Sequence, residues 1–332
     1  MIIHVAILDT DIPVRPVYSA RGLYSSQFRT LLQSAAGRMN NNSSNRQTEK
    51  IEIQTSAYDV VGGAFPALDM LRSPKTKNVK KSVQAPPIDA IIVTGSLASS
   101  YQIEKYPWIM QLQEYIQTVW REYPAVKMFG SCFGHQLIAQ ALLSQGSGKE
   151  QIFFIDEKTV TPPGTAYVEA CPLGFEIGIH PITLNPAFVS SAAPALSTLR
   201  DGKMRIQLFH GDRVVSSSST KDLPAPWLNI GSTELSPIQG LFYPGRVLTY
   251  QGHFEFDAWL NRELVVACAS RWGWTEEMIQ RYMEQVEQNS GEDDSELAAE
   301  VVVWFFAGNN SSKSVGPIKR FTDRFRKMLC LG

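Results

Sequence analysis

Hydrophobic residues along this chain fall into short apolar runs, separated by longer stretches in which apolar and polar positions recur with helical spacing. A helix is predicted around residues 26–36, between the first two runs. Apolar runs that alternate with helices favour a parallel sheet with helices on both of its faces. The pattern therefore predicts an α/β fold, with strands at Ile2–Leu8, Ile88–Thr94, Val126–Phe129, Met204–Phe209 and Val247–Gln251.

The later part of the chain changes character twice. From about Ile152 to Pro237, short apolar runs are separated by proline and glycine, which predicts a β-rich decoration of the sheet. Beyond Asp257 the pattern becomes helical, with one helix that begins at a Thr275 N-cap and a second one over about Glu296–Phe306. The final segment alternates apolar and basic residues, and we expect this amphipathic tail to pack on the protein itself rather than on a membrane surface or a partner.

Two polar segments interrupt the first part of the chain. Residues 38–50 are rich in asparagine and serine, and residues 73–85 are rich in lysine. Such segments have too few apolar groups to be buried, so we expect exposed, mobile loops; a docking patch at the second one is the less favoured alternative. We therefore divide the chain into one domain over residues 1–270 and a helical extension over residues 271–332 that packs on the same domain.

Composition indicates the cellular compartment and the classes of partner, but says little about the reaction. The 332 residues have a net charge of −1, with no basic stripe that would indicate a nucleic-acid partner. Four cysteines, at 132, 171, 268 and 330, show no paired spacing of the kind that zinc sites use, so no metal is expected. No apolar stretch has the length of a membrane span. We expect a cytoplasmic protein whose partners are small molecules or other proteins.

One cysteine stands where a strand turns sharply into a helix. The stretch Phe129-Gly130-Ser131-Cys132-Phe133-Gly134-His135-Gln136 follows an apolar run and precedes a helical pattern. A residue on such a turn lies at a helix N-terminus, where backbone N–H groups and the positive end of the helix dipole lower the pKa of a thiol. The flanking glycines allow the tight backbone and leave room for a carbonyl group. Cys132 is therefore a candidate nucleophile.

A second motif, far downstream, supplies what a thiol nucleophile needs. The apolar run that ends near Gln251 continues into Gly252-His253-Phe254-Glu255. Residues two apart on an extended segment point to the same side, so Glu255 can orient one imidazole nitrogen while the other faces the thiol. A base for the thiol and an acid that orients the base are the parts of a catalytic triad.

With both motifs in this order, the chain resembles the class I glutamine amidotransferase superfamily over roughly residues 4–257. That superfamily has the nucleophile motif G-x-C-x-G-x-Q and a late G-H-x-E motif. Its most similar branch is that of free-standing fungal and plant members related to γ-glutamyl peptidases, on the strength of the segments at 6–11, 94–96, 106–109 and 176–181. The resemblance implies a flavodoxin-like, mostly parallel sheet for the catalytic domain, and no cofactor.

The resemblance also implies roles for individual residues. Cys132 is the nucleophile, His253 the general base and then acid, and Glu255 its orienting partner. Gly95 and Ser96 form the turn of an oxyanion hole, to which Phe133 adds its backbone N–H, and Gln136 completes the substrate-binding set. Two positions depart from the family pattern: the double glycine of the oxyanion turn is Gly95-Ser96 here, and the proline after the histidine is Phe254.

Other arrangements of the same residue types are less favoured. An α/β-hydrolase with a cysteine nucleophile also has a G-x-C-x-G turn, but its acid precedes the histidine, whereas Glu255 follows His253. Asp201 or Asp222 could serve as the acid, although neither lies at a predicted strand end. We interpret the remaining histidines near apolar runs, at 135, 180 and 210, as structural.

These expectations lead to one favoured function and two alternatives. The favoured one is an amide hydrolase or transferase that acts through an acyl-Cys132 thioester on a glutamine-like or γ-glutamyl substrate. The first alternative is a glutaminase subunit that supplies ammonia to a separate synthase, because no nucleotide-binding G-x-x-x-x-G-K-[ST] motif occurs in this chain. The second is a tailoring enzyme of secondary metabolism with a non-glutamyl acyl substrate. A non-catalytic scaffold is disfavoured because all three triad residue types are present.

Overall fold

A seven-stranded sheet forms the centre of the molecule, whose computed structural model describes residues 1–41, 50–73, 86–144, 164–192, 194–217, 223–288 and 291–308. The strand order is β11-β13-β14-β4-β3-β1-β2. The strands from β14 to β2 run parallel, and β13 and β11 extend the sheet in antiparallel fashion. The bounds are β1 (Ile2–Asp9), β2 (Glu52–Asp59), β3 (Ala90–Val93), β4 (Lys127–Ser131), β11 (Leu228–Asn229), β13 (Leu241–Tyr243) and β14 (Val247–Tyr250). The predicted α/β fold is confirmed.

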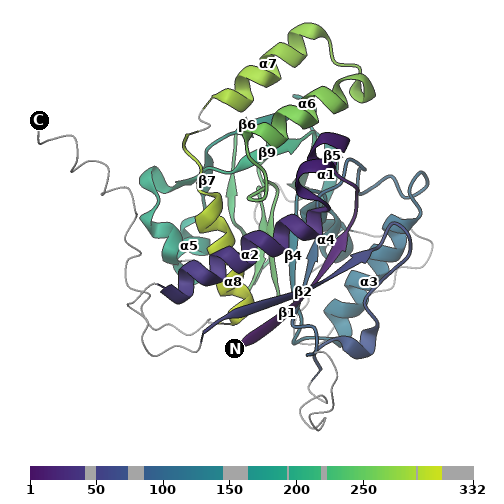
Figure 1. Cartoon of the computed structure of the whole chain (residues 1–332), viewed down its shortest axis with the longest axis vertical. Helices are drawn as coiled ribbons and strands as arrows, with labels where there is room; N and C mark the ends of the chain where they lie inside the picture. Colours follow the sequence, from purple (N-terminus) through teal and green to yellow (C-terminus); the bar gives the residue numbers. More distant parts are fainter. Residues whose placement is uncertain are drawn as a thin grey trace, which may run out of the picture.

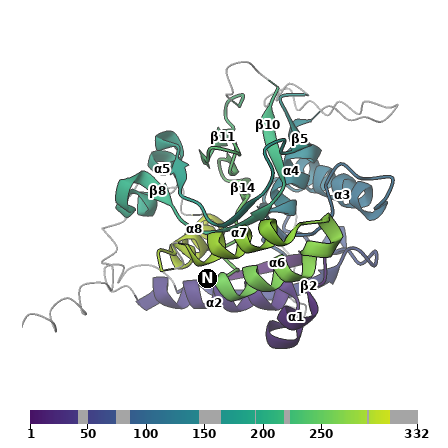
Figure 2. The same ribbon diagram turned by 90° about the horizontal axis from the view of Figure 1, so that it is seen from above.

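Helices cover both faces of this sheet (Figures 1 and 2). Side chains of β1 alternate between the faces, so that Val5 and Ile7 join one hydrophobic cluster and Ala6 and Leu8 join the other. The first cluster includes residues of α2, α6 and α8, and the second includes residues of α3 and α4. The helices are α1 (Arg15–Arg21), α2 (Tyr24–Asn41), α3 (Trp108–Glu122), α4 (Phe133–Leu143), α5 (Pro186–Ala192), α6 (Ala258–Trp272), α7 (Glu276–Glu287) and α8 (Ser295–Ala307).

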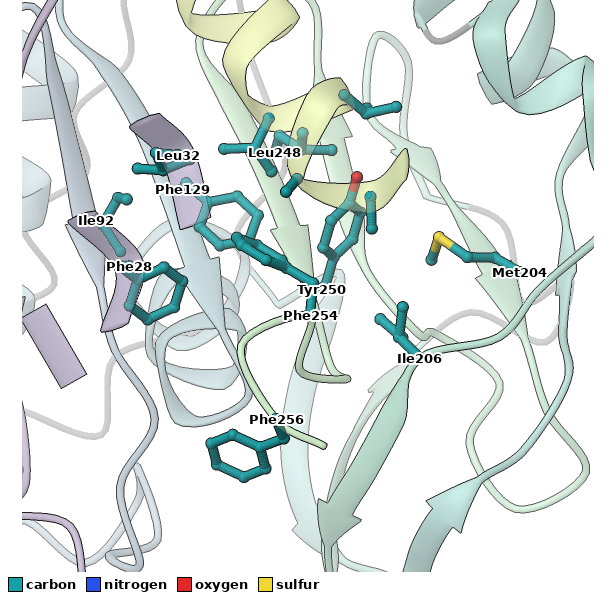
Figure 3. Packing of buried hydrophobic residues seen from close by; sticks show 14 of the residues in the cluster. Phe28, Leu32, Ile92, Phe129, Met204, Ile206, Leu248, Tyr250, Phe254 and Phe256 are labelled. Atoms are coloured by element: carbon teal, nitrogen blue, oxygen red, sulfur yellow. The ribbon is translucent and has the colours of Figure 1, made fainter. Parts of the chain in front are cut away.

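In the first cluster, aromatic rings pack together at β4 and β14, the two strands that lead to the sequence motifs (Figure 3). Phe129 of β4 packs edge-on against Tyr250 of β14, with 5.3 Å between the ring centroids. Phe254 also lies against Phe129, at 5.7 Å, and edge-on to Phe28 of α2, at 5.4 Å. Because these rings are fully or almost fully buried, they hold the ends of β4 and β14 in a fixed relation.

The β-rich decoration consists of small sheets beside the central one. They pair β5 (Ala166–Ala170) with β10 (Asp212–Ser216), β6 (Glu176–Ile179) with β9 (Gln207–His210), and β7 (Ile182–Leu184) with both β8 (Lys203–Met204) and β12 (Gly231–Ser232). Short 3₁₀ helices within the described segments include η2 (Leu68–Met70), η4 (Pro194–Thr198) and η5 (Arg200–Gly202).

The prediction of one central-sheet strand over Met204–Phe209 is wrong. This stretch is divided between β8 and β9, which belong to two different small sheets. The reason lies at Arg205, whose backbone N–H donates to the Asp294 carboxylate at 2.9 Å and whose carbonyl accepts from the Asp294 N–H at 2.7 Å. The Arg205 backbone is therefore bonded to the segment before α8 instead of to a neighbouring strand.

The predicted loop over residues 38–50 begins too early. Helix α2 continues to Asn41, because Arg38 pairs with Glu300 of α8 at 2.7 Å and the side chain of Asn40 bonds the backbone of Ile51. Residues 42–49 and 74–85 lie outside the described part, as does the amphipathic tail from residue 309 onward. The predicted helices near 276 and 296 are present, and Thr275 accepts a hydrogen bond from the Met278 N–H as the N-cap of α7.

A lysine of the sheet bonds the C-terminal end of helix α8. The ammonium of Lys127, at the start of β4, donates to the carbonyls of Phe305 and Phe306 at 2.6 and 3.2 Å. These carbonyls belong to the last turn of α8, where helical hydrogen bonds run out. Burial lowers the pKa of Lys127 to about 8.

Candidate active site

Cys132 lies between β4 and α4, at the point where the chain leaves the sheet. Its φ is +50° and its ψ is −104°, a conformation that residues with a side chain rarely adopt. The Cys132 N–H donates to the carbonyl of Tyr250 at 2.9 Å, so the turn is tied to the end of β14. Only 6% of the residue is exposed. The thiol therefore lies near the N-terminus of α4, almost enclosed by protein.

Two glycines make this sharp turn possible. A Cβ atom on Gly134 would lie 2.2 Å from the carbonyl oxygen of Val93 in β3, and a Cβ on Gly130 would lie 2.5 Å from the backbone of Gly134. Both positions bring backbone directly against backbone, which no larger residue allows. The first turn of α4 can therefore lie flat on the ends of β3 and β4, and the glycines of the nucleophile motif have a steric explanation.

His253 and Glu255 reach the same edge of the sheet from β14. Strands β4 and β14 are adjacent and parallel, with Ser131 opposite Tyr250, so the segments that follow them emerge side by side. The His253 N–H donates to the carbonyl of Gln207 in β9 at 2.7 Å, which fixes the backbone there. The Nδ1 atom of His253 lies 2.7 Å from Oε1 of Glu255. The histidine and its acid are thus held together as an ion pair or strong hydrogen bond.

The electrostatics of His253 depend on both neighbours. Burial alone disfavours a charged imidazolium, but the Glu255 carboxylate and then the Cys132 thiol outweigh that cost and raise the pKa of His253 to about 10. The ring is also stacked on Phe256, with 3.7 Å between centroids and an angle of 5° between the planes. The imidazole is therefore held in one orientation between a carboxylate and a sulfur, an arrangement in which the ring can hold the proton of the sulfur.

Ser131 completes this group, and sequence reasoning missed it. Its hydroxyl donates to Oε1 of Glu255 at 2.9 Å and lies 3.4 Å from Nδ1 of His253. The signal was present in the sequence, because Ser131 directly precedes the cysteine at the end of a strand that neighbours the histidine's strand. A hydroxyl at this position can form hydrogen bonds with polar side chains that follow the adjacent strand.

The residues expected around the oxyanion and the substrate occupy different surroundings. A Cβ on Gly95 would lie 3.0 Å from Cε1 of His253 and 3.8 Å from Cβ of Cys132, so the turn after β3 touches both residues. Phe133 is the first residue of α4, where a backbone N–H has no partner within the helix. The amide nitrogen of Gln136 donates to the carbonyl of Asp212 and to Gln251, both at 3.1 Å. Its amide therefore braces the start of β10 against α4.

The other wall of the site is formed by β9. The Cys132 thiol donates to the carbonyl of Phe209 at 3.8 Å, so β9 passes directly beside the sulfur. Within the described ranges there is no group of three or more histidine, cysteine, aspartate or glutamate residues arranged to hold a metal ion.

The remaining candidate bases and acids are occupied elsewhere. His135 bonds Thr249 at 2.8 Å, and burial lowers its pKa to about 3, which keeps it neutral. His180 bonds the carbonyl of Ile177 at 2.9 Å. His210 lies 3.2 Å from Glu176. Asp201 pairs with Arg205 at the surface, and Asp222 lies outside the described residues. The structure thus brings Glu255, and not Asp201, to His253.

Comparison with known proteins gives consistent results for sequence and fold. No protein-family model matches the chain. A glutamine amidotransferase-like protein of Schizosaccharomyces pombe is 26% identical over 295 residues, covering 87% of this chain and 94% of that protein. A protein of Saccharomyces cerevisiae described as a candidate glutamine amidotransferase is 29% identical over 220 residues, covering 64% and 68%. The crystal structure of a glutamine amidotransferase from Thermotoga maritima superposes with a TM-score of 0.53 at 15% identity, covering 92% of this chain and 98% of that one.

One further property concerns membranes. Among the helices of the described residues, none combines the length and the apolar character that a membrane crossing requires.

Proposed function

Because this chain has the class I glutamine amidotransferase-like fold and resembles glutamine amidotransferase-like proteins of fungi, we propose that it is a cysteine-dependent amide hydrolase or acyl transferase. The chief support is one contact: His253 is held by Glu255 at 2.7 Å while its ring interacts with Cys132 on the strained turn. A thiol, a base and an orienting acid in this relation are suited to nucleophilic attack on a carbonyl carbon.

The proposed reaction has two halves. Cys132 Sγ, whose proton His253 already holds, attacks the carbonyl carbon of an amide, and the carbonyl oxygen becomes an oxyanion near the N–H groups of Ser96 and Phe133. The intermediate collapses when His253 returns the proton to the nitrogen, which leaves as an amine or ammonia. Water, deprotonated by His253, then attacks the acyl-Cys132 thioester and releases a carboxylic acid. An acceptor amine in place of water makes the same enzyme a transferase.

The favoured substrate is a γ-glutamyl amide, either in glutamine or in a γ-glutamyl peptide or conjugate. This choice is supported by the sequence similarity to glutamine amidotransferase-like proteins and by the paired motifs around Cys132 and His253. If glutamine is the substrate, the product ammonia serves a separate synthase as partner. A non-glutamyl acyl group would assign the chain to a tailoring reaction.

The decisive experiment measures glutamate release by the purified full-length chain. Glutamine and a γ-glutamyl tripeptide are supplied in parallel, and Cys132→Ala is the control, because alanine replaces one small side chain with another and leaves the turn intact. We expect release from at least one substrate, loss of it in Cys132→Ala, and an acyl adduct on Cys132 detectable by mass spectrometry in a quenched reaction.

The outcomes separate the candidate functions. Release from the peptide alone identifies a free-standing γ-glutamyl hydrolase, and release from glutamine identifies an ammonia source. Glutamate release that persists in Cys132→Ala would refute the proposal. If neither substrate reacts but Cys132 still takes up an acyl group from an activated ester, the enzyme class stands and the glutamyl substrate is wrong.

A further inference from the structure

The residues that follow β1 approach the turn that follows β3. The two strands are adjacent and parallel, with Leu8 opposite Val93, so both chains leave the sheet at the edge where Cys132 lies. After β1 come Thr10 and Asp11, and after β3 comes the turn from Gly95 to Leu97. Thr10 is 1% exposed. Its hydroxyl lies within 3.1 Å of the Thr94 carbonyl, the Thr94 hydroxyl and the Gly95 carbonyl. The Asp11 carboxylate accepts from Ile12, Ser96 and Leu97.

Thr10 and Thr94 both place a hydroxyl against the carbonyl oxygen of Gly95, which helps to fix the direction of that peptide plane. The Thr10 hydroxyl lies 2.9 Å from the carbonyl oxygen of Gly95 and donates to it. In a trans peptide the carbonyl and the following N–H point in opposite directions. The N–H of Ser96 therefore points away from Thr10. Among the described residues it has no hydrogen-bond partner, so it is available to an incoming oxyanion.

The peptide groups on the two sides of Leu97 are each bonded to a charged side chain, one negative and one positive. The Asp11 carboxylate accepts from the N–H of Leu97 at 2.9 Å and from the hydroxyl of Ser96 at 3.2 Å. The guanidinium of Arg271, on the last turn of α6, donates to the carbonyl of Leu97 at 3.3 Å. Leu97 is thus bound at its N–H by an anion and at its carbonyl by a cation, and charge-assisted hydrogen bonds are the stronger kind.

We propose that Thr10 and Asp11 are positioning residues that hold the Ser96 N–H in the orientation needed to stabilise the oxyanion of acyl transfer, with Arg271 as an outer support. The proposal deepens the function proposed above and rests on it. The turn borders the thiol, because a Cβ on Gly95 would lie 3.0 Å from Cε1 of His253 and 3.8 Å from Cβ of Cys132. None of the motifs in the sequence indicates this role.

The expected size of the effect follows from the chemistry. A backbone N–H in an oxyanion hole contributes only when it is aimed at the place where charge develops, and losing one donor or displacing it by about 1 Å lowers the rate by about 10²-fold or more. Alkylation of the same thiol forms no oxyanion. A variant that only misplaces the turn will therefore lose acylation and keep alkylation, whereas a variant that disturbs the whole site will lose both.

The test compares two reagents on Cys132 of the full-length chain. Acylation by p-nitrophenyl acetate and alkylation by iodoacetamide are each followed by mass spectrometry of the peptide that contains Cys132, so that the other cysteines do not interfere. The variants are Asp11→Ala and Asp11→Asn, the latter because its amide oxygen still accepts from Leu97. Asp59→Ala is the matched control, because Asp59 ends the neighbouring strand β2 but its carboxylate accepts from Gly62 N–H at 2.9 Å.

We expect Asp11→Ala to lower the acylation rate by about 10- to 100-fold, with alkylation within about two-fold of the unmodified chain. Asp11→Asn should recover most of the loss, and Asp59→Ala should change neither rate. Thr10→Val, which keeps the shape and removes the hydroxyl, repeats the test if Asp11→Ala does not fold.

Three results would overturn the proposal: equal losses of acylation and alkylation, no loss of acylation, or a Cys132 that the ester acylates no faster in the folded than in the denatured chain. None of these requires the natural substrate. A failure to release glutamate would therefore refute the glutamyl function while this comparison still decides the role of Asp11.

Discussion

At the scale of single residues, one carboxylate oxygen connects the strands on either side of the candidate site. Oε1 of Glu255 accepts from Nδ1 of His253 at 2.7 Å and from the hydroxyl of Ser131 at 2.9 Å. The carboxylate therefore fixes the imidazole tautomer, and the serine fixes the carboxylate. The two contacts differ in expected importance, because only the first involves His253, the group proposed to move protons.

This difference gives a prediction for two variants. Glu255→Gln should lower the turnover rate by about 10²- to 10⁴-fold with little change in KM, because an amide allows the wrong tautomer and removes the charge that supports imidazolium. Ser131→Ala should cost about tenfold, because it removes a single hydrogen bond to the carboxylate. Steady-state kinetics on the active substrate checks both. Equal effects of the two variants, or an unchanged rate in Glu255→Gln, would contradict the assigned roles.

The sequence alone predicts Cys132, His253 and Glu255 as parts of one site, because each lies in a short motif with its own local geometry. It does not predict Ser131, Thr10 and Asp11, for a physical reason. Their contacts join residues that follow different strands, and those contacts depend on the order and register of the sheet. Even with the fold class known, a hydroxyl or carboxylate after a strand does not reveal which neighbouring turn it will bond.

At the scale of elements, the start of α4 is the most tightly constrained part of the site. A methyl group on Gly134 would lie 2.2 Å from the Val93 carbonyl oxygen, an atom of the sheet that cannot move aside without disturbing β3. The helix can approach only because this residue has no side chain. The position of the thiol is thus a consequence of backbone packing between α4, β3 and β4.

Gly134→Ala should therefore destabilise the protein by about 1–3 kcal/mol, since the helix must move away from the strand. Gly37→Ala is the matched control in a helix: no atom lies within 4 Å of the added methyl group, and the change should stabilise by about 0.5–1 kcal/mol. Urea unfolding of both variants measures these free energies. Similar values for the two would mean that the close contact at Gly134 is relieved by a small shift.

The elements differ in how far the sequence alone predicts them. The buried strands β1, β3, β4 and β14 were predicted close to their observed bounds, because strands buried on both faces are nearly continuous apolar runs. Strand β2 was missed, because it lies at the edge of the sheet and Ile53 is its one buried residue, so it contains no continuous apolar run. The division of β8 from β9 depends on Asp294, which is distant in sequence and therefore leaves no local signal.

At the scale of the whole molecule, the proton on His253 couples the site to folding stability. The pKa of His253 in the folded protein, about 10, lies above its ordinary value of 6.5. The folded protein thus keeps a proton that the unfolded chain releases. The stabilisation from this group is complete below pH 6.5 and is lost as the pH rises toward 10.

Urea unfolding of the unmodified chain and of His253→Gln between those two pH values tests this coupling. The unmodified chain should lose stability more steeply than the variant, by up to about 1.4 kcal/mol per pH unit. In Cys132→Ala the loss should end at a lower pH and be smaller in total, because the sulfur no longer contributes to holding the proton. Parallel profiles for the unmodified chain and His253→Gln would show that the histidine is not charged in the folded protein.

The positive φ of Cys132 has a consequence for the evolution of this sequence. A residue with a side chain at φ +50° is held there against its own preference, at a cost of about 1–3 kcal/mol. Glycine adopts this conformation without that cost, so glycine at this position would stabilise the fold. Lineages that no longer need a thiol at this turn should therefore accumulate glycine there. A cysteine retained in this conformation marks a lineage in which the sulfur is still under selection.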